Sequence, residues 1–94
     1  MSEQFQVESM GDHDYLVRAR HSDGVVESRF RANPAVLDRL RVSEADERRV
    51  VRESVAYLAE RQSVVDLPQM VDLEDVAAAY DDYVDELSRR LAAS

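Results

Sequence analysis

Polar and apolar residues alternate along the first third of the chain in a pattern that predicts three short β-strands. Successive side chains of a strand point to opposite faces of the sheet, so alternate residues share a face. We therefore expect strands at about residues 4–9, 15–21 and 25–31, each with one face turned to a core. The residues of that face are Phe5, Val7 and Ser9; Tyr15, Val17, Ala19 and His21; and Val26, Ser28 and Phe30.

A turn signal between the second and third segments predicts how these two strands pair. Asp23-Gly24 is typical of a two-residue hairpin loop, because both central residues of such a turn need a positive φ. This turn would place Val17 opposite Phe30 and Ala19 opposite Ser28.

A second loop, formed by residues 11–13, predicts the pairing of the first two strands. It would place Ser9 opposite Tyr15 and Val7 opposite Val17. Both loops put the apolar positions on one face, and such agreement between separate signals favours the assignment. The sequence thus predicts a three-stranded antiparallel β-meander.

The middle of the chain predicts two helices. Asn33-Pro34 combines a favoured N-cap with a proline at the first helical position, which indicates a short helix at about 34–41. Ser43 and Asp46 are spaced like a capping box, so a longer helix is expected at about 44–62. At 100° per residue, one side of this longer helix collects Val50, Val51, Ser54, Val55, Tyr57 and Leu58.

The last third of the chain predicts a connector and one further helix. Residues 63–71 have a proline and no sustained period, which indicates a packed connector. Asp72 is a suitable N-cap for a second amphipathic helix at about 72–91. Its apolar stripe is made of Leu73, Val76, Tyr80, Val84, Leu87 and Leu91.

Length and composition are those of one small α+β domain over residues 1–94. A chain of 94 residues with 45% hydrophobic content can bury one core, and the absence of Cys excludes disulfides and cysteine metal ligands. No basic, apolar leader or run of about 20 apolar residues occurs, so we expect a cytoplasmic protein that does not enter a membrane.

Several stretches resemble a group of small uncharacterised prokaryotic α+β proteins, of the kind found in actinobacteria. That group has a helix ending in an F-L-L-E-R type sequence, followed by S-I-L and by F-D-L-x-x-I before the last helix. The similar stretches here are Ala32 to Leu37, Val51 to Arg61, Ser63 to Val65 and Val71 to Val76. The resemblance implies the order of the elements, and it implies no activity, cofactor or catalytic residue.

The residues available for chemistry do not form a recognisable active site. His13 is expected in an exposed loop and His21 at the rim of the sheet, at opposite ends of one strand and more than about 20 Å apart. No serine lies in a nucleophile elbow, neither Gly belongs to a phosphate-binding loop, and the helical acids lack the spacing of a calcium loop. We therefore predict no catalytic, metal-binding or cofactor-binding residue, no small-molecule ligand and no enzyme activity.

The face of the sheet opposite the predicted core is rich in arginine. With the Asp23-Gly24 turn, Arg18 and Arg29 would be direct neighbours, an unfavourable pair of like charges unless another group satisfies them. One interpretation is a solvated face with ion pairs to Glu8 and Glu27; the other is a docking face for an acidic partner. The candidate partner-binding residues are Arg18, Arg20, Arg29 and Arg31.

The charge distribution favours a protein partner over a nucleic acid. The net charge is −8, and base stacking would need exposed aromatic residues that this face lacks. Residues 43–94 carry thirteen acids and six bases, so a second copy of the chain could supply the acidic surface. We predict a small interaction or regulatory module that uses this face or a sheet edge, with a nucleic-acid-binding or antitoxin-like regulator as the alternative.

Overall fold

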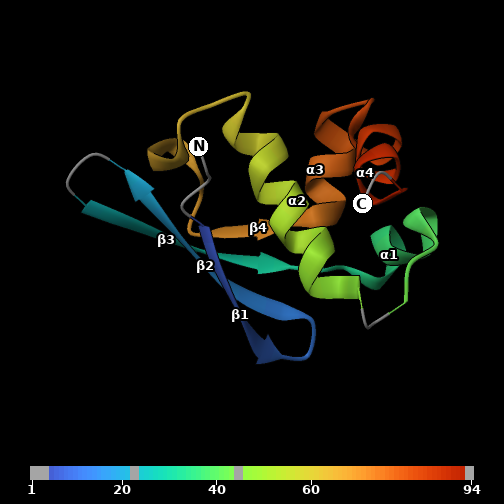
Figure 1. The fold of residues 1–94 in the computed structure, drawn as a ribbon, viewed down its shortest axis with the longest axis horizontal. Helices are drawn as coiled ribbons and strands as arrows, with labels where there is room; N and C mark the ends of the chain where they lie inside the picture. Colours follow the sequence, from blue (N-terminus) through green and yellow to red (C-terminus); the bar gives the residue numbers. More distant parts are fainter. Residues whose placement is uncertain (1–4, 22–23, 44–45, 93–94) are drawn as a thin grey trace.

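The protein is an α+β domain in which helices cover one face of a four-stranded mixed sheet (Figure 1). The computed structural model describes residues 5–21, 24–43 and 46–92. The strands are β1 (Phe5–Gly11), β2 (Asp14–His21), β3 (Gly24–Arg31) and β4 (Met70–Asp72), in the spatial order β1-β2-β3-β4. The helices are α1 (Pro34–Leu40), α2 (Glu47–Ala59), α3 (Leu73–Ala79) and α4 (Tyr83–Ala92), with a 3-10 turn, η2 (Val64–Asp66).

The predicted pairing of β1 with β2 is confirmed. Val7 lies opposite Val17 and Ser9 opposite Tyr15, with an irregularity between Ser9 and Gly11. Gly11, Asp12 and His13 have φ values of 88°, 52° and 68°, so the whole turn is left-handed. The predicted loop is therefore in the right place.

The predicted register between β2 and β3 is wrong by two residues. Val17 lies opposite Ser28, and His21 lies opposite Gly24, so Gly24 belongs to the strand. The connection is residues 22–23, which lie outside the described residues, in place of Asp23-Gly24. The observed register places Arg18 opposite Glu27, which replaces a like-charge pair by an attractive one. A shift of two residues keeps every side chain on its predicted face.

The three antiparallel strands of the predicted meander are present, but a fourth strand, which was not predicted, joins them. β4 runs parallel to β3, with Met70 opposite Arg29. The Arg29 N–H donates to the Gln69 carbonyl at 2.7 Å, and the Ser28 hydroxyl donates to the Pro68 carbonyl at 2.6 Å. The segment 63–71 predicted as a connector thus contains both η2 and the start of β4. A strand of three residues is too short to produce a detectable period.

The first helix has the predicted start and nearly the predicted end. The Asn33 side chain accepts from the Ala35 N–H at 2.9 Å, Pro34 follows, and Arg41 closes the helix in a left-handed conformation. α2 is shorter than the predicted range 44–62: it begins at Glu47 and has its C-cap at Glu60. The predicted capping box is wrong, because the N-cap is Asp46 in place of Ser43 and the Asp46 side chain makes no capping hydrogen bond. Residues 44–45 lie outside the described residues.

The predicted helix over 72–91 is two helices, α3 and α4. Asp72 caps α3 as expected, accepting from the Glu74 N–H at 2.9 Å. Tyr80 then takes an extended conformation, with φ −124° and ψ 111°. Asp81 and Asp82 at the break are weak helix formers, and the break lets Tyr80 approach α2 independently of α4.

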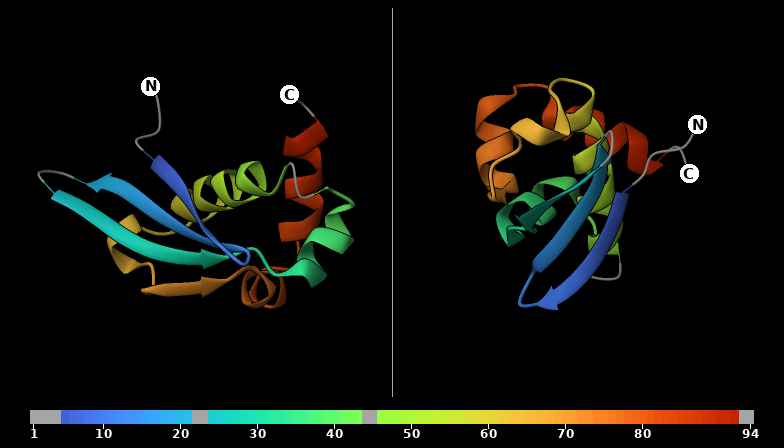
Figure 2. Two further views of the ribbon diagram at one scale, coloured as in Figure 1. Left: turned by 90° about the horizontal axis from the view of Figure 1, so that it is seen from below. Right: turned by 90° about the vertical axis from the view of Figure 1, so that its left-hand side faces the viewer.

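The core lies between the sheet and the helices (Figure 2). The strand residues of the predicted core face are buried wherever the structure describes their side chains, apart from Ser9, which is exposed, and Val26, which is half-buried. The apolar side predicted for α2 is buried in full. Among the described residues, no helix has the length and apolar character needed to span a bilayer.

Candidate functional site

The open face is the side of the sheet turned away from the helices. Because neighbouring residues of paired strands share a face, one row of side chains crosses all four strands as Glu8, Leu16, Arg29 and Met70. The open face consists of Gln6, Glu8, Asp14, Leu16, Arg18, Arg20, Val25, Glu27, Arg29, Arg31, Met70 and Asp72. All four arginines predicted for this face are on it.

Two of these arginines are held by neighbours on the face. Arg18 donates through Nε to Glu27 at 2.8 Å and lies 3.5 Å from Glu8. The hydrogen bond to Glu27 is the largest cause of a raised pKa for the Arg18 guanidinium. Arg31 lies 3.5 Å from Asp14. The prediction that Arg18 and Arg29 are neighbours is wrong, whereas the expected local ion pairs exist.

The other two arginines are exposed and have no ion pair with any described residue. Arg20 lies opposite Val25 near the end of the β2–β3 hairpin. Arg29 lies in the central row, between Leu16 on β2 and Met70 on β4. A guanidinium between two apolar side chains can use its planar surface for packing while its donors stay available to an acceptor. The position of Arg29 between Leu16 and Met70 makes it the centre of the candidate site.

A hollow of about 370 Å³ opens beside Arg29. It is lined by Leu16, Glu27, Ser28, Arg29, Gln69 and Met70. Met70 is 62% exposed although it is apolar. A cation that has no ion pair in the described part of the chain, next to exposed apolar groups, is typical of a protein-binding surface.

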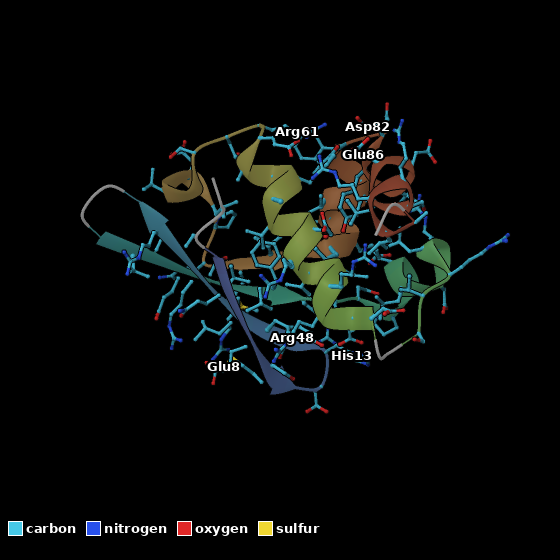
Figure 3. The ribbon with its side chains drawn as sticks, in the orientation of Figure 1. Glu8, His13, Arg48, Arg61, Asp82 and Glu86 are labelled. Carbon is cyan, nitrogen blue, oxygen red and sulfur yellow. The ribbon has the colours of Figure 1, made fainter. Side chains whose placement is uncertain are left out.

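A second polar cluster joins the β1–β2 turn to the start of α2. The Glu47 carboxylate accepts from His13 Nδ1 at 2.8 Å and from the Tyr15 hydroxyl at 3.0 Å. Figure 3 shows His13 below the first turn of α2. Glu47 is only 5% exposed, and His13 is 30% exposed. The prediction placed His13 correctly in a loop but missed this contact, because no local pattern relates residues 34 positions apart.

The Glu47 cluster is best explained as a structural link. Both carboxylate oxygens are used by groups of the β1–β2 hairpin, and the burial of Tyr15 with its bond to Glu47 raises the Tyr15 pKa to about 12. A pocket of about 350 Å³ adjoins the cluster, lined by Ser9, Gly11, Asp12, His13 and Glu47. Within the described ranges, no group of three His, Cys, Asp or Glu residues could hold a metal ion.

We expect Glu47→Ala to lower the free energy of unfolding by about 2–4 kcal/mol, because it leaves the buried Tyr15 hydroxyl unpaired and opens a void. Urea titration at pH 7 measures this change. Glu53→Ala, on the same helix but half-buried, is the matched control and should cost less than about 0.5 kcal/mol. Equal losses in both variants would contradict the assigned link.

A third cluster joins the end of α2 to α4. The Tyr57 hydroxyl donates to Asp82, and the Arg61 guanidinium lies 3.6 Å from the centre of the Tyr57 ring. The bond from Tyr57, together with Arg61, lowers the pKa of the Asp82 carboxyl. Figure 3 shows Arg61, Asp82 and Glu86 close together. The Arg90 guanidinium lies 2.7 Å from the Glu60 carboxylate and 2.9 Å from the Glu86 carboxylate. These ion pairs connect the end of α2 to α4.

The fold and the open face together define a class: a small α+β domain with helices on one face of a mixed sheet and, at the centre of the other face, an arginine that has no ion pair with a described residue. Comparisons with protein families, with curated proteins and with solved structures found no match. The resemblance to small prokaryotic proteins therefore stays a prediction.

Proposed function

We propose that this protein is a small non-catalytic interaction module that binds a partner protein through the open face. The observation that carries the proposal is the position of Arg29. It lies in the central row of the sheet, beside a hollow, with apolar neighbours and with no ion pair to a described residue. A partner that supplies a carboxylate would gain a charge-assisted hydrogen bond there.

The charges on the open face support an acidic protein segment over a nucleic acid. Arg18 and Arg31 are already paired with carboxylates of the chain, which leaves Arg20 and Arg29 for a partner. Two separated guanidinium groups on a chain of net charge −8 give a weak attraction for a phosphate backbone. Nucleic-acid binding is therefore the alternative that the experiments must separate from protein binding.

We expect Arg29→Glu to lose the partner, because it places a carboxylate where the partner's acid would bind. The measurement is quantitative affinity capture from a lysate of the source organism, with the purified wild type and variants immobilised at equal density. A specific partner should bind the wild type and be reduced at least tenfold for Arg29→Glu. Arg39→Glu, at an exposed position of α1, makes the same change in net charge and should bind like the wild type.

Two further measurements separate the alternatives. Binding of a random oligonucleotide at about 50 mM salt, lost in Arg18→Ala with Arg29→Ala, would support nucleic-acid binding instead. Light scattering over a range of salt and protein concentrations would reveal a second copy as the partner. Equal capture by wild type, Arg29→Glu and Arg39→Glu would overturn the proposal.

A further inference from the structure

The outer edge of β4 has backbone groups that are free to pair. β4 lies at the margin of the sheet in the left view of Figure 2, and none of the described helices or strands lies beside its outer edge. The Arg29 N–H bonds to Gln69, and Met70 lies opposite Arg29. In a parallel pair, alternate residues turn their backbone groups toward the neighbouring strand. The N–H and C=O of Met70 therefore point outward, and they have no partner among the described residues.

Two hollows flank this edge and share Met70. The first is the hollow on the open face, which contains Leu16 and Arg29. The second, of about 190 Å³, lies on the helix side and is mostly apolar. Its walls come from the end of α2, the chain before β4 and α3. They include the apolar residues Leu58, Leu67, Val71 and Val76 and, at the start of α3, the acids Asp72 and Asp75. Met70 thus lies between a hollow that contains Arg29 and Glu27 and a hollow that is mostly apolar.

This arrangement matches the alternation of an added β-strand. A strand placed beside β4 would turn one side chain toward the open face and the next toward the helix side. Main-chain hydrogen bonds supply affinity in strand addition, while hollows for alternate side chains supply specificity. Arg29 favours an acidic side chain on the open face, and the second hollow favours apolar side chains on the other.

We propose that an extended segment of a partner protein, with alternating apolar and acidic residues, pairs with the outer edge of β4 as a fifth strand. The proposal rests on the proposed function and names the class of partner for the same surface. Its acidic side chain reaches Arg29, its backbone bonds to Met70, and its apolar side chains enter the hollow between α2 and α3. The previously solvent-exposed Met70 becomes covered.

The probe is a peptide with fluorescein on its N-terminal amine and an amidated C-terminus, with the sequence Gly-Leu-Glu-Leu-Glu-Leu-Gly. Fluorescence anisotropy with the full chain should give saturable binding. A peptide with Lys for each Glu should bind at least tenfold more weakly, because it places ammonium groups beside Arg29. A peptide with N-methylated central residues should also lose at least tenfold, because it cannot pair with a strand edge.

Variants of the protein test the three contacts separately. Met70→Pro removes the outward N–H without removing a hydrogen bond inside the sheet, and it should weaken binding at least tenfold; Met70→Ala keeps the N–H and should weaken binding less. Ala79→Phe fills the helix-side hollow from an exposed position, and Arg29→Gln removes the charge. Circular dichroism verifies that each variant folds, and amide exchange in the wild type should slow at least tenfold at Met70 when the peptide is bound.

The outcomes distinguish this inference from the proposed function. Binding that needs Arg29 but is indifferent to peptide N-methylation and to Met70→Pro would overturn strand addition and leave the open face as the binding surface. The absence of saturable binding at about 1 mM peptide would also overturn strand addition. The affinity-capture experiment with Arg29→Glu tests the proposed function separately. Equal binding of the Lys and Glu peptides would show that Arg29 does not select an acidic partner, and it would contradict both the strand-addition proposal and the proposed function.

Discussion

Replacing Tyr57 by alanine is expected to lower the free energy of unfolding by about 3–5 kcal/mol, the usual cost of removing a buried aromatic ring. Tyr57 is fully buried, and the rings of Tyr80 and Tyr83 meet it edge-on at 5.7 and 5.3 Å. The substitution removes these contacts and the support for Arg61 at the same time. Urea unfolding followed by circular dichroism measures the loss.

Tyr57→Phe is the matched control for this prediction. It keeps the ring and removes only the hydroxyl that bonds to Asp82, whose side chain is 62% exposed and can be hydrated instead. We expect a loss of about 1 kcal/mol. A loss in Tyr57→Phe as large as in Tyr57→Ala would show that the hydrogen bond, and not ring packing, holds α4 on α2.

Alkaline pH is expected to unfold the protein through its buried tyrosines. Burial is the largest cause that raises the pKa of Tyr15, Tyr57 and Tyr83 to about 12, from an ordinary value of 10.0. The folded state then holds protons that the unfolded state releases above pH 10. The stabilisation is complete below about pH 10 and is lost as the pH rises through about 12.

The free energy of unfolding should therefore fall between about pH 10 and 12, by up to about 1.4 kcal/mol per pH unit for each tyrosine. Urea titrations at a series of pH values measure this slope. Tyr83→Phe should make this slope shallower by the contribution of one titrating group, because the variant releases one proton fewer on unfolding. An unchanged slope in Tyr83→Phe would contradict the role assigned to that hydroxyl.

Features that depend on residues close together in the chain could be predicted from the sequence. The Asn33 cap, the β1–β2 turn and the buried side of α2 all depend on residues close together in the chain, and the structure confirms them. The prediction failed at the Tyr80 break, because the apolar stripe continues through Tyr80 and hides the change of direction. Ring contacts with Tyr57, 23 residues earlier, accompany that break.

The sequence predicts which face of the sheet carries the candidate site, but it does not predict which residues of that face contact one another. The four arginines were assigned to the correct side of the sheet even though the β2–β3 register was wrong, since a shift of two residues preserves the face. The register decides which arginine forms an ion pair with a described residue. It places Glu27 opposite Arg18, and it places Arg29 between Leu16 and Met70.

The α+β class, the faces of three strands and the caps of α1 and α3 follow from the amino-acid order alone, because they depend on periods of two or 3.6 residues and on local hydrogen bonding. Tertiary packing was needed to show that β4 joins the sheet, that Glu47 links the first hairpin to α2, and that Arg29 lies beside a hollow with no ion pair to a described residue. Each of these depends on contacts such as that between Arg29 and Gln69, which are far apart in the chain and leave no local pattern.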